Sequence, residues 1–90
     1  MPTADSIRKW SISTTPQTDK DLGRLSKPDR ERIKRSIQKL PEGDIRQLQG
    51  WRPPVWRLRV GNWRVLYRLN ISEAIITVIA VRPRGSAYKP

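Results

Sequence analysis

Residues 55–69 read VWRLRVGNWRVLYRL and decide the fold, because they form two alternating segments around a two-residue turn. Apolar and basic residues alternate on both sides, as in strands with one buried face. Gly61-Asn62 suits a tight hairpin turn and places Arg59 opposite Arg64. Like charges directly opposite one another are destabilising. The opposed pair of Arg59 and Arg64 does not favour folding, whereas binding of a phosphate-rich partner would explain it.

The alternation gives the hairpin two different faces. Arg57, Arg59 and Arg64 project from one face, with Arg68 further along it. The core-facing side is apolar and comprises Leu58, Val60, Val65, Tyr67 and Leu69. The planar guanidinium of arginine suits bidentate contacts with phosphate. The alternative interpretation is a solvated basic face that keeps the protein soluble.

Segments outside the hairpin predict the remaining elements. We expect a strand over residues 7–13 and helices over 15–25 and 26–39, each helix with a hydroxyl cap and a proline near its start. Residues 41–54 read as a polar loop, and residues 74–81 as a β-branched central strand buried on both faces. The sequence predicts an α+β fold of order β-α-α-β-β-β, with two N-terminal helices packed on one face of a small, mostly antiparallel twisted sheet.

The composition narrows the possible functions. The 90 residues fit one domain over positions 1–90, and they include no cysteine and no histidine. Disulfides, thiolate metal sites and histidine-based catalysis are therefore excluded, and we expect neither a metal nor a cofactor. No apolar run resembles a signal peptide or spans a bilayer. We expect a soluble, cytoplasmic protein without a membrane partner.

The net positive charge is concentrated in the second half of the chain. The net charge is +11, and residues 45–90 contribute +8 from nine basic residues and one acid. Such a domain attracts polyanions through counterion release. Nucleic acid, an anionic membrane and an acidic protein are the candidates. The membrane is disfavoured because no long basic helix carries an aromatic apolar face.

The basic tail follows the predicted central strand, so its side chains should lie beside the hairpin face. Arg82 and Arg84 would add phosphate contacts there, and Tyr88 would stack on a base or donate a proton. The alternative is a frayed basic C-terminus.

The tryptophans divide into two groups. Trp56 and Trp63 are expected to pack in the core, as their register in the hairpin suggests. Trp51, in the predicted loop, is the best candidate for an exposed residue that stacks on bases. The basic helix over residues 29–39 is interpreted as a solvated face rather than a phosphate site.

The run WRLRVGNWRVLYRL followed by ITVIAVRPRGSAY resembles the RelE/ParE toxin superfamily of type II toxin–antitoxin modules, over roughly residues 8–88. The resemblance implies a helical hairpin on a twisted antiparallel sheet. RelE-like members are ribosome-dependent endoribonucleases that cleave mRNA by attack of a 2′-OH on the adjacent phosphate. ParE-like members share the fold but poison DNA gyrase without this chemistry. Both kinds are held inactive by an antitoxin that wraps the toxin.

The resemblance also assigns roles to residues. It implies a catalytic set of Arg59, Arg64, Arg82 and Tyr88, and further RNA phosphate contacts from Arg57, Arg68 and Arg84. The basic pair on the first hairpin strand is often lysine in RelE-like members, but here both positions are arginine. Arginine stays protonated and is a poor base. Tyr88 is then the only evident titratable group of the set, and it would need cationic neighbours to act as a base.

The leading hypothesis is a type II toxin that inhibits translation as a RelE-like mRNA endoribonuclease. Its expected partners are a cognate antitoxin, in a toxin–antitoxin hetero-oligomer, and mRNA on the ribosome. One alternative is a ParE-like, non-catalytic gyrase inhibitor. A further alternative is a basic nucleic-acid-binding module with no toxin role.

Overall fold

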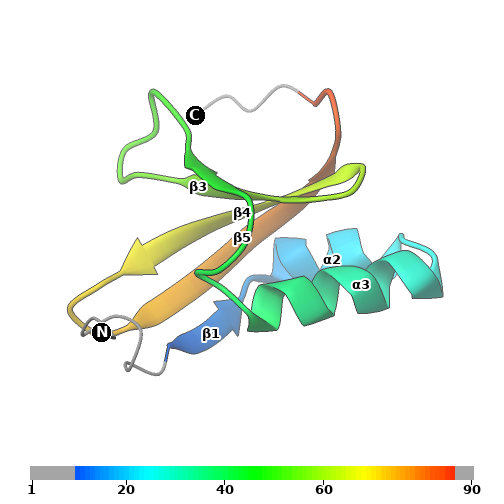
Figure 1. The fold of residues 1–90 in the computed structure, drawn as a ribbon, viewed down its shortest axis with the longest axis horizontal. Helices are drawn as coiled ribbons and strands as arrows, with labels where there is room; N and C mark the ends of the chain where they lie inside the picture. Colours follow the sequence, from blue (N-terminus) through cyan, green and yellow to red (C-terminus); the bar gives the residue numbers. More distant parts are fainter. Residues whose placement is uncertain (1–9, 87–90) are drawn as a thin grey trace.

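The computed structural model describes residues 10–86, which form two helices and a five-stranded sheet. The sheet order is β1-β5-β4-β3-β2, with β1 parallel to β5 and the other neighbours antiparallel. Both helices lie on one side of the sheet (Figure 1). The elements are β1 (Ser11–Thr14), α2 (Pro16–Gly23), α3 (Lys27–Gln38), β2 (Ile45–Gln47), β3 (Trp56–Val60), β4 (Trp63–Asn70) and β5 (Ile75–Pro83). The predicted α+β fold is confirmed.

The predicted order lacks one strand, since the observed order is β-α-α-β-β-β-β, and two strand boundaries also differ. The segment 41–54, expected to be a loop, contains the edge strand β2, which pairs with β3. Three residues are too few to show a strand periodicity, and the pairing comes from the neighbouring strand. The first strand spans only Ser11–Thr14, all exposed, and residues 7–9 lie outside the described part of the chain. Strand β5 continues to Pro83, so Arg82 belongs to the sheet.

Hydroxyl caps start both helices, as expected from their first residues. Thr15 Oγ1 accepts the backbone N–H of Thr18 at 3.2 Å, and Ser26 Oγ accepts that of Asp29 at 3.4 Å. The buried Thr18 hydroxyl donates to the carbonyl oxygen of Val78 in β5 at 2.8 Å. The first turn of α2 is therefore fixed to β5 as well as capped.

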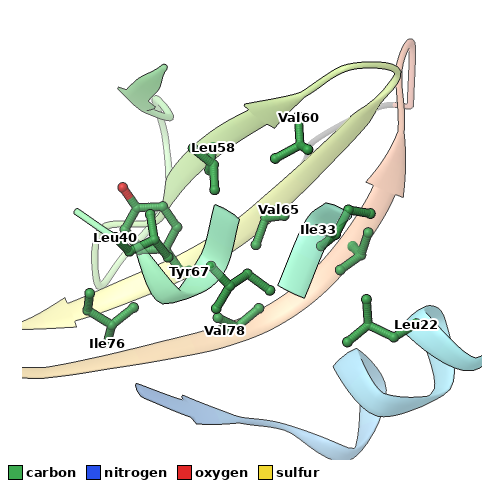
Figure 2. Packing of buried hydrophobic residues seen from close by; sticks show 11 residues of the cluster. Leu22, Ile33, Leu40, Leu58, Val60, Val65, Tyr67, Ile76 and Val78 are labelled. Carbon is green, nitrogen blue, oxygen red and sulfur yellow. The ribbon is translucent and has the colours of Figure 1, made fainter. Parts of the chain in front are cut away.

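The main core lies between the helices and the sheet (Figure 2). It contains the apolar residues of α3 and most of the predicted inward side of the hairpin. Trp56 and Trp63 pack against it, as expected. Its buried members are Leu22, Ile33, Ile37, Leu40, Leu58, Val60, Val65, Tyr67, Ile76, Val78 and Val81.

A second, smaller core lies on the opposite face of the sheet. Val55, Leu66 and Ala80 are buried there, and Leu48 and Trp51 of the connecting segment pack over them. The prediction that Trp51 is an exposed stacking residue is therefore wrong. Its indole Nε1 is buried and has no hydrogen-bond partner among residues 10–86. The second core has no counterpart in the alternation of the hairpin, where Leu66 falls between two arginines.

A β-bulge sets the pairing between the last two strands. Leu66 pairs with Ala80 and Tyr67 with Val78, so Ile79 is an extra residue in β5. The carbonyl oxygen of Ile79 accepts the hydroxyl of Thr15 at 3.1 Å. The cap of α2 thus also holds the bulge. The extra residue changes which β5 side chains face each side of the sheet.

Candidate functional site: an arginine row

Three arginines lie side by side across the sheet. The predicted pairing of Arg59 with Arg64 is confirmed, and Arg64 pairs in turn with Arg82 on β5. We call Arg59, Arg64 and Arg82 the arginine row. Neighbouring strands are about 5 Å apart, so the backbone positions of these three arginines lie close together. Like charges directly opposite one another are destabilising, and within the row only Arg82 forms an ion pair among residues 10–86.

The bulge at Ile79 creates the third member of the row. Before the bulge, Tyr67 pairs with Val78 and Arg68 with Thr77. If that register continued, Val81 rather than Arg82 would lie opposite Arg64. The shift of one residue brings Arg82 opposite Arg64. The sequence placed Arg82 beside the hairpin face but did not predict this pairing.

Each arginine of the row is held differently. Arg64 Nη1 donates to the carbonyl oxygens of Gly61 and Trp63, both at 2.9 Å, so its guanidinium lies against the turn. Arg82 Nη1 lies 2.7 Å from Asp21 Oδ2. The Arg59 side chain is exposed and has no ion-pair partner among residues 10–86.

The hairpin turn brings a further arginine from α3. Gly61 has a φ of 57°, the conformation that the first residue of a type II′ hairpin turn requires. A Cβ atom at this position would lie 2.8 Å from Arg32 Nη1. Arg84 is also close, since its N–H donates to the carbonyl oxygen of Asn62 at 2.7 Å. Arg32 was overlooked because the basic helix gave no sign of which residue reaches the hairpin.

The other two arginines of the hairpin do not pair with members of the row. Arg57 is opposite Leu66, and its Nη1 forms a 3.5 Å ion pair with Asp44. Arg68 is four residues beyond Arg64, or about 13 Å along the strand. It lines a cavity of about 380 Å³ with Pro53, Pro54 and Trp56, among others. Tyr88 lies outside the described residues.

The described tyrosine cannot replace Tyr88 in proton transfer. Tyr67 is fully buried, and its hydroxyl has no hydrogen-bond partner among residues 10–86. Burial raises the pKa of Tyr67 from 10.0 to about 12, although the positive charge of Arg57 acts in the opposite direction. The hydroxyl therefore stays protonated and inaccessible at neutral pH.

The raised pKa of Tyr67 makes stability depend on alkaline pH. Above pH 10 the unfolded chain loses this proton while the folded chain keeps it, so the free energy of unfolding should fall between pH 10 and about 12. Tyr67→Phe should remove this component of the fall. It should also raise the free energy of unfolding at pH 7 by about 1 kcal/mol, because an unpartnered buried hydroxyl is removed. Urea titrations of both proteins at several pH values test this, and identical alkaline profiles would contradict it.

The part of the chain that the structure describes contains neither a cluster of metal-ligating side chains nor a membrane-spanning helix. No group of three or more potential metal-ligating side chains occurs within residues 10–86. Within the same residues, no helix has the length and apolarity needed to cross a membrane.

The fold and the arginine-rich hairpin define a toxin of the RelE/ParE superfamily. The family model of the ParE toxin of the type II toxin–antitoxin system parDE matches residues 12–88. The chain belongs to this family. No significant match was found among curated protein sequences.

Solved structures support the superfamily assignment. The archaeal RelE–RelB complex of Pyrococcus horikoshii OT3 contains a chain with 26% identity and a TM-score of 0.69, covering 87% of this chain and 98% of that chain. The RelBE2 complex of Mycobacterium tuberculosis contains a chain with 18% identity and a TM-score of 0.73, and the match covers 83% of this chain and 98% of that chain. The isolated E. coli RelE toxin has 15% identity and a TM-score of 0.68, and the match covers 88% of each chain. The last two identities are low, so these two structures support the fold alone.

Proposed function

We propose that this toxin is a RelE-like endoribonuclease that cleaves mRNA on the ribosome and so inhibits translation. The observation that carries the proposal is the row of Arg59, Arg64 and Arg82 across three strands. In the proposed reaction a ribose 2′-oxygen attacks the adjacent phosphorus and the 5′-oxygen leaves. Negative charge accumulates on the phosphorane, and fixed guanidinium groups stabilise it. Ribosomal positioning of the mRNA would compensate for weak acid–base groups.

The residues of the proposed site have different roles. Arg59 and Arg64 bind the scissile phosphate, Arg82 assists them, and Tyr88 transfers a proton. Nearby arginines would lower the pKa of a tyrosine and favour its phenolate form. The remaining basic residues contact neighbouring phosphates, namely Arg57, Arg68 and Arg84.

A cognate antitoxin is the proposed protein partner. Several of the similar structures are RelE–RelB toxin–antitoxin complexes. The net charge of +11 favours a partner with an acidic segment, which charge complementarity would steer to the arginine row. Such a segment would block access of RNA while the toxin–antitoxin hetero-oligomer is intact.

Mapping of RNA ends after a short induction pulse without antitoxin tests the endoribonuclease proposal. We expect new 5′ ends inside translated regions, and none in the same transcript when its start codon is removed. The start-codon variant is the matched control, since it differs only at the start codon and is not translated. Growth arrest with unchanged mRNA would contradict the proposal.

The second candidate is gyrase inhibition, which the match to the ParE family model favours. In this case the basic face would bind protein or DNA and no RNA would be cut. Induction would then stop DNA replication and raise an SOS response while mRNA stays intact. Measuring DNA and protein synthesis in the same induced culture separates the two candidates.

A further inference from the structure

Asp21 is a buried carboxylate that the proposed mechanism leaves unused. It lies near the end of α2 and is only 6% exposed. Its Oδ1 accepts a hydrogen bond from Gln17 Nε2 at 2.8 Å. Its Oδ2 accepts two, from the N–H of Val81 at 2.9 Å and from Arg82 Nη1 at 2.7 Å. One oxygen thus joins the β5 backbone to a side chain of the arginine row.

The place of Asp21 in the fold explains the bond to Val81. Strand β1 pairs with β5 only as far as Val78. Beyond that point β5 has no neighbouring strand on this edge, and the N–H of Val81 would lack a sheet partner. The carboxylate of Asp21 takes the place of a strand carbonyl. This bond fixes the backbone of β5 next to Arg82.

The rest of the Arg82 guanidinium remains available. Within the described residues its recorded bonds use Nη1 alone, to Asp21 and, at 3.3 Å, to the carbonyl oxygen of Val81. The side chain is 38% exposed. It lines a cavity of about 370 Å³ together with Arg24, Trp63 and Pro83, among others. Neither Arg59 nor Arg64 lines this cavity, so a phosphate entering it would meet the free donors of Arg82 beside the row.

We infer that Asp21 is a positioning residue, which holds the Arg82 guanidinium in a fixed orientation so that its remaining donors contact an RNA phosphate. The inference rests on the proposed endoribonuclease function. A free arginine side chain samples many rotamers, and ordering it opposes binding of the transition state. The charge-assisted bond to a buried carboxylate orders the side chain before RNA arrives. Asp21 acts through Arg82 and does not itself touch the substrate.

Asp21→Asn tests the inference because the amide has nearly the same shape and its oxygen can still accept from Val81. We expect kcat for ribosome-dependent cleavage to fall by about 10- to 100-fold. RNA affinity should not weaken, because the substitution raises the net charge by one. Arg82→Ala should lower kcat similarly, and the double variant should be no slower than the slower single variant. Gln17→Ala, which removes only the bond to Oδ1, is the control and should keep the wild-type rate.

Wild-type kcat in Asp21→Asn, or multiplied losses in the double variant, would overturn the inference. The NMR signals of the Arg82 guanidinium decide it independently of cleavage, and also if the asparagine variant loses stability. Hindered rotation in the wild type and in Gln17→Ala, lost in Asp21→Asn, supports the inference. Equal signals in all three proteins overturn it. Absence of cleavage by the wild-type protein would instead refute the proposed function, and the NMR comparison would still decide whether Asp21 orders Arg82.

Discussion

Replacement of Arg64 by alanine is expected to abolish growth arrest on induction while the chain stays folded. Arg64 is the central member of the arginine row, with Arg59 on one side and Arg82 on the other. Loss of one fixed donor to a developing anion lowers kcat by about 10²- to 10³-fold. Cleavage of mRNA on purified ribosomes measures this directly. Unchanged cleavage by a folded variant would contradict the proposed site.

Two further variants separate this effect from changes in net charge and in folding. Arg35→Ala removes one positive charge from an exposed position on α3 and should leave cleavage unchanged. Arg64→Lys keeps the charge but loses the planar fork that suits bidentate phosphate contacts. We expect the lysine variant to bind RNA with the wild-type salt dependence and to cleave more slowly. Circular dichroism and thermal unfolding report whether loss of the Arg64 bonds to the turn disturbs the hairpin.

Leu66→Ala is expected to cost about 2–5 kcal/mol of the free energy of unfolding. A domain of this size has about 5–15 kcal/mol in total, so the variant should lose a large part of its stability. Leu66 is 5% exposed and lies in the second core, under the segment that contains Leu48 and Trp51. Urea unfolding monitored by tryptophan fluorescence measures the change.

Ile71→Ala is the matched control for this experiment. Ile71 is 60% exposed, so the same kind of truncation removes little buried surface and should change the stability by less than about 1 kcal/mol. Equal losses for the two variants would mean that the connecting segment does not pack over the sheet. The comparison therefore tests whether the connecting segment packs over this face, which the alternation of arginines in the hairpin did not indicate.

The hairpin and the helix starts could be read from the residues because they depend on local interactions. A two-residue turn with glycine first fixes the register of its two strands, so the opposition of Arg59 and Arg64 followed directly. The caps at Thr15 and Ser26 satisfy backbone groups three residues away. Such signals need no knowledge of the rest of the molecule.

Other features were missed because distant segments create them. Strand β2 exists through its pairing with β3, and Trp51 is half-buried because its segment crosses the sheet. The Asp44–Arg57 ion pair joins residues from the same two regions. No local pattern distinguishes a loop that leaves the sheet from one that folds back over it.

The arginine row depends on both local turn geometry and long-range strand pairing. The local turn is sufficient to pair Arg59 with Arg64, and this pair is visible in the residues alone. The third member depends on the long-range pairing of β4 with β5, where one extra residue, Ile79, replaces Val81 by Arg82 opposite Arg64. The orientation of Arg82 depends on the packing of α2, which brings Asp21 to the edge of β5 from 61 residues away in the chain. Turn geometry acts over a few bonds, whereas bulges and buried ion pairs depend on how the whole core packs.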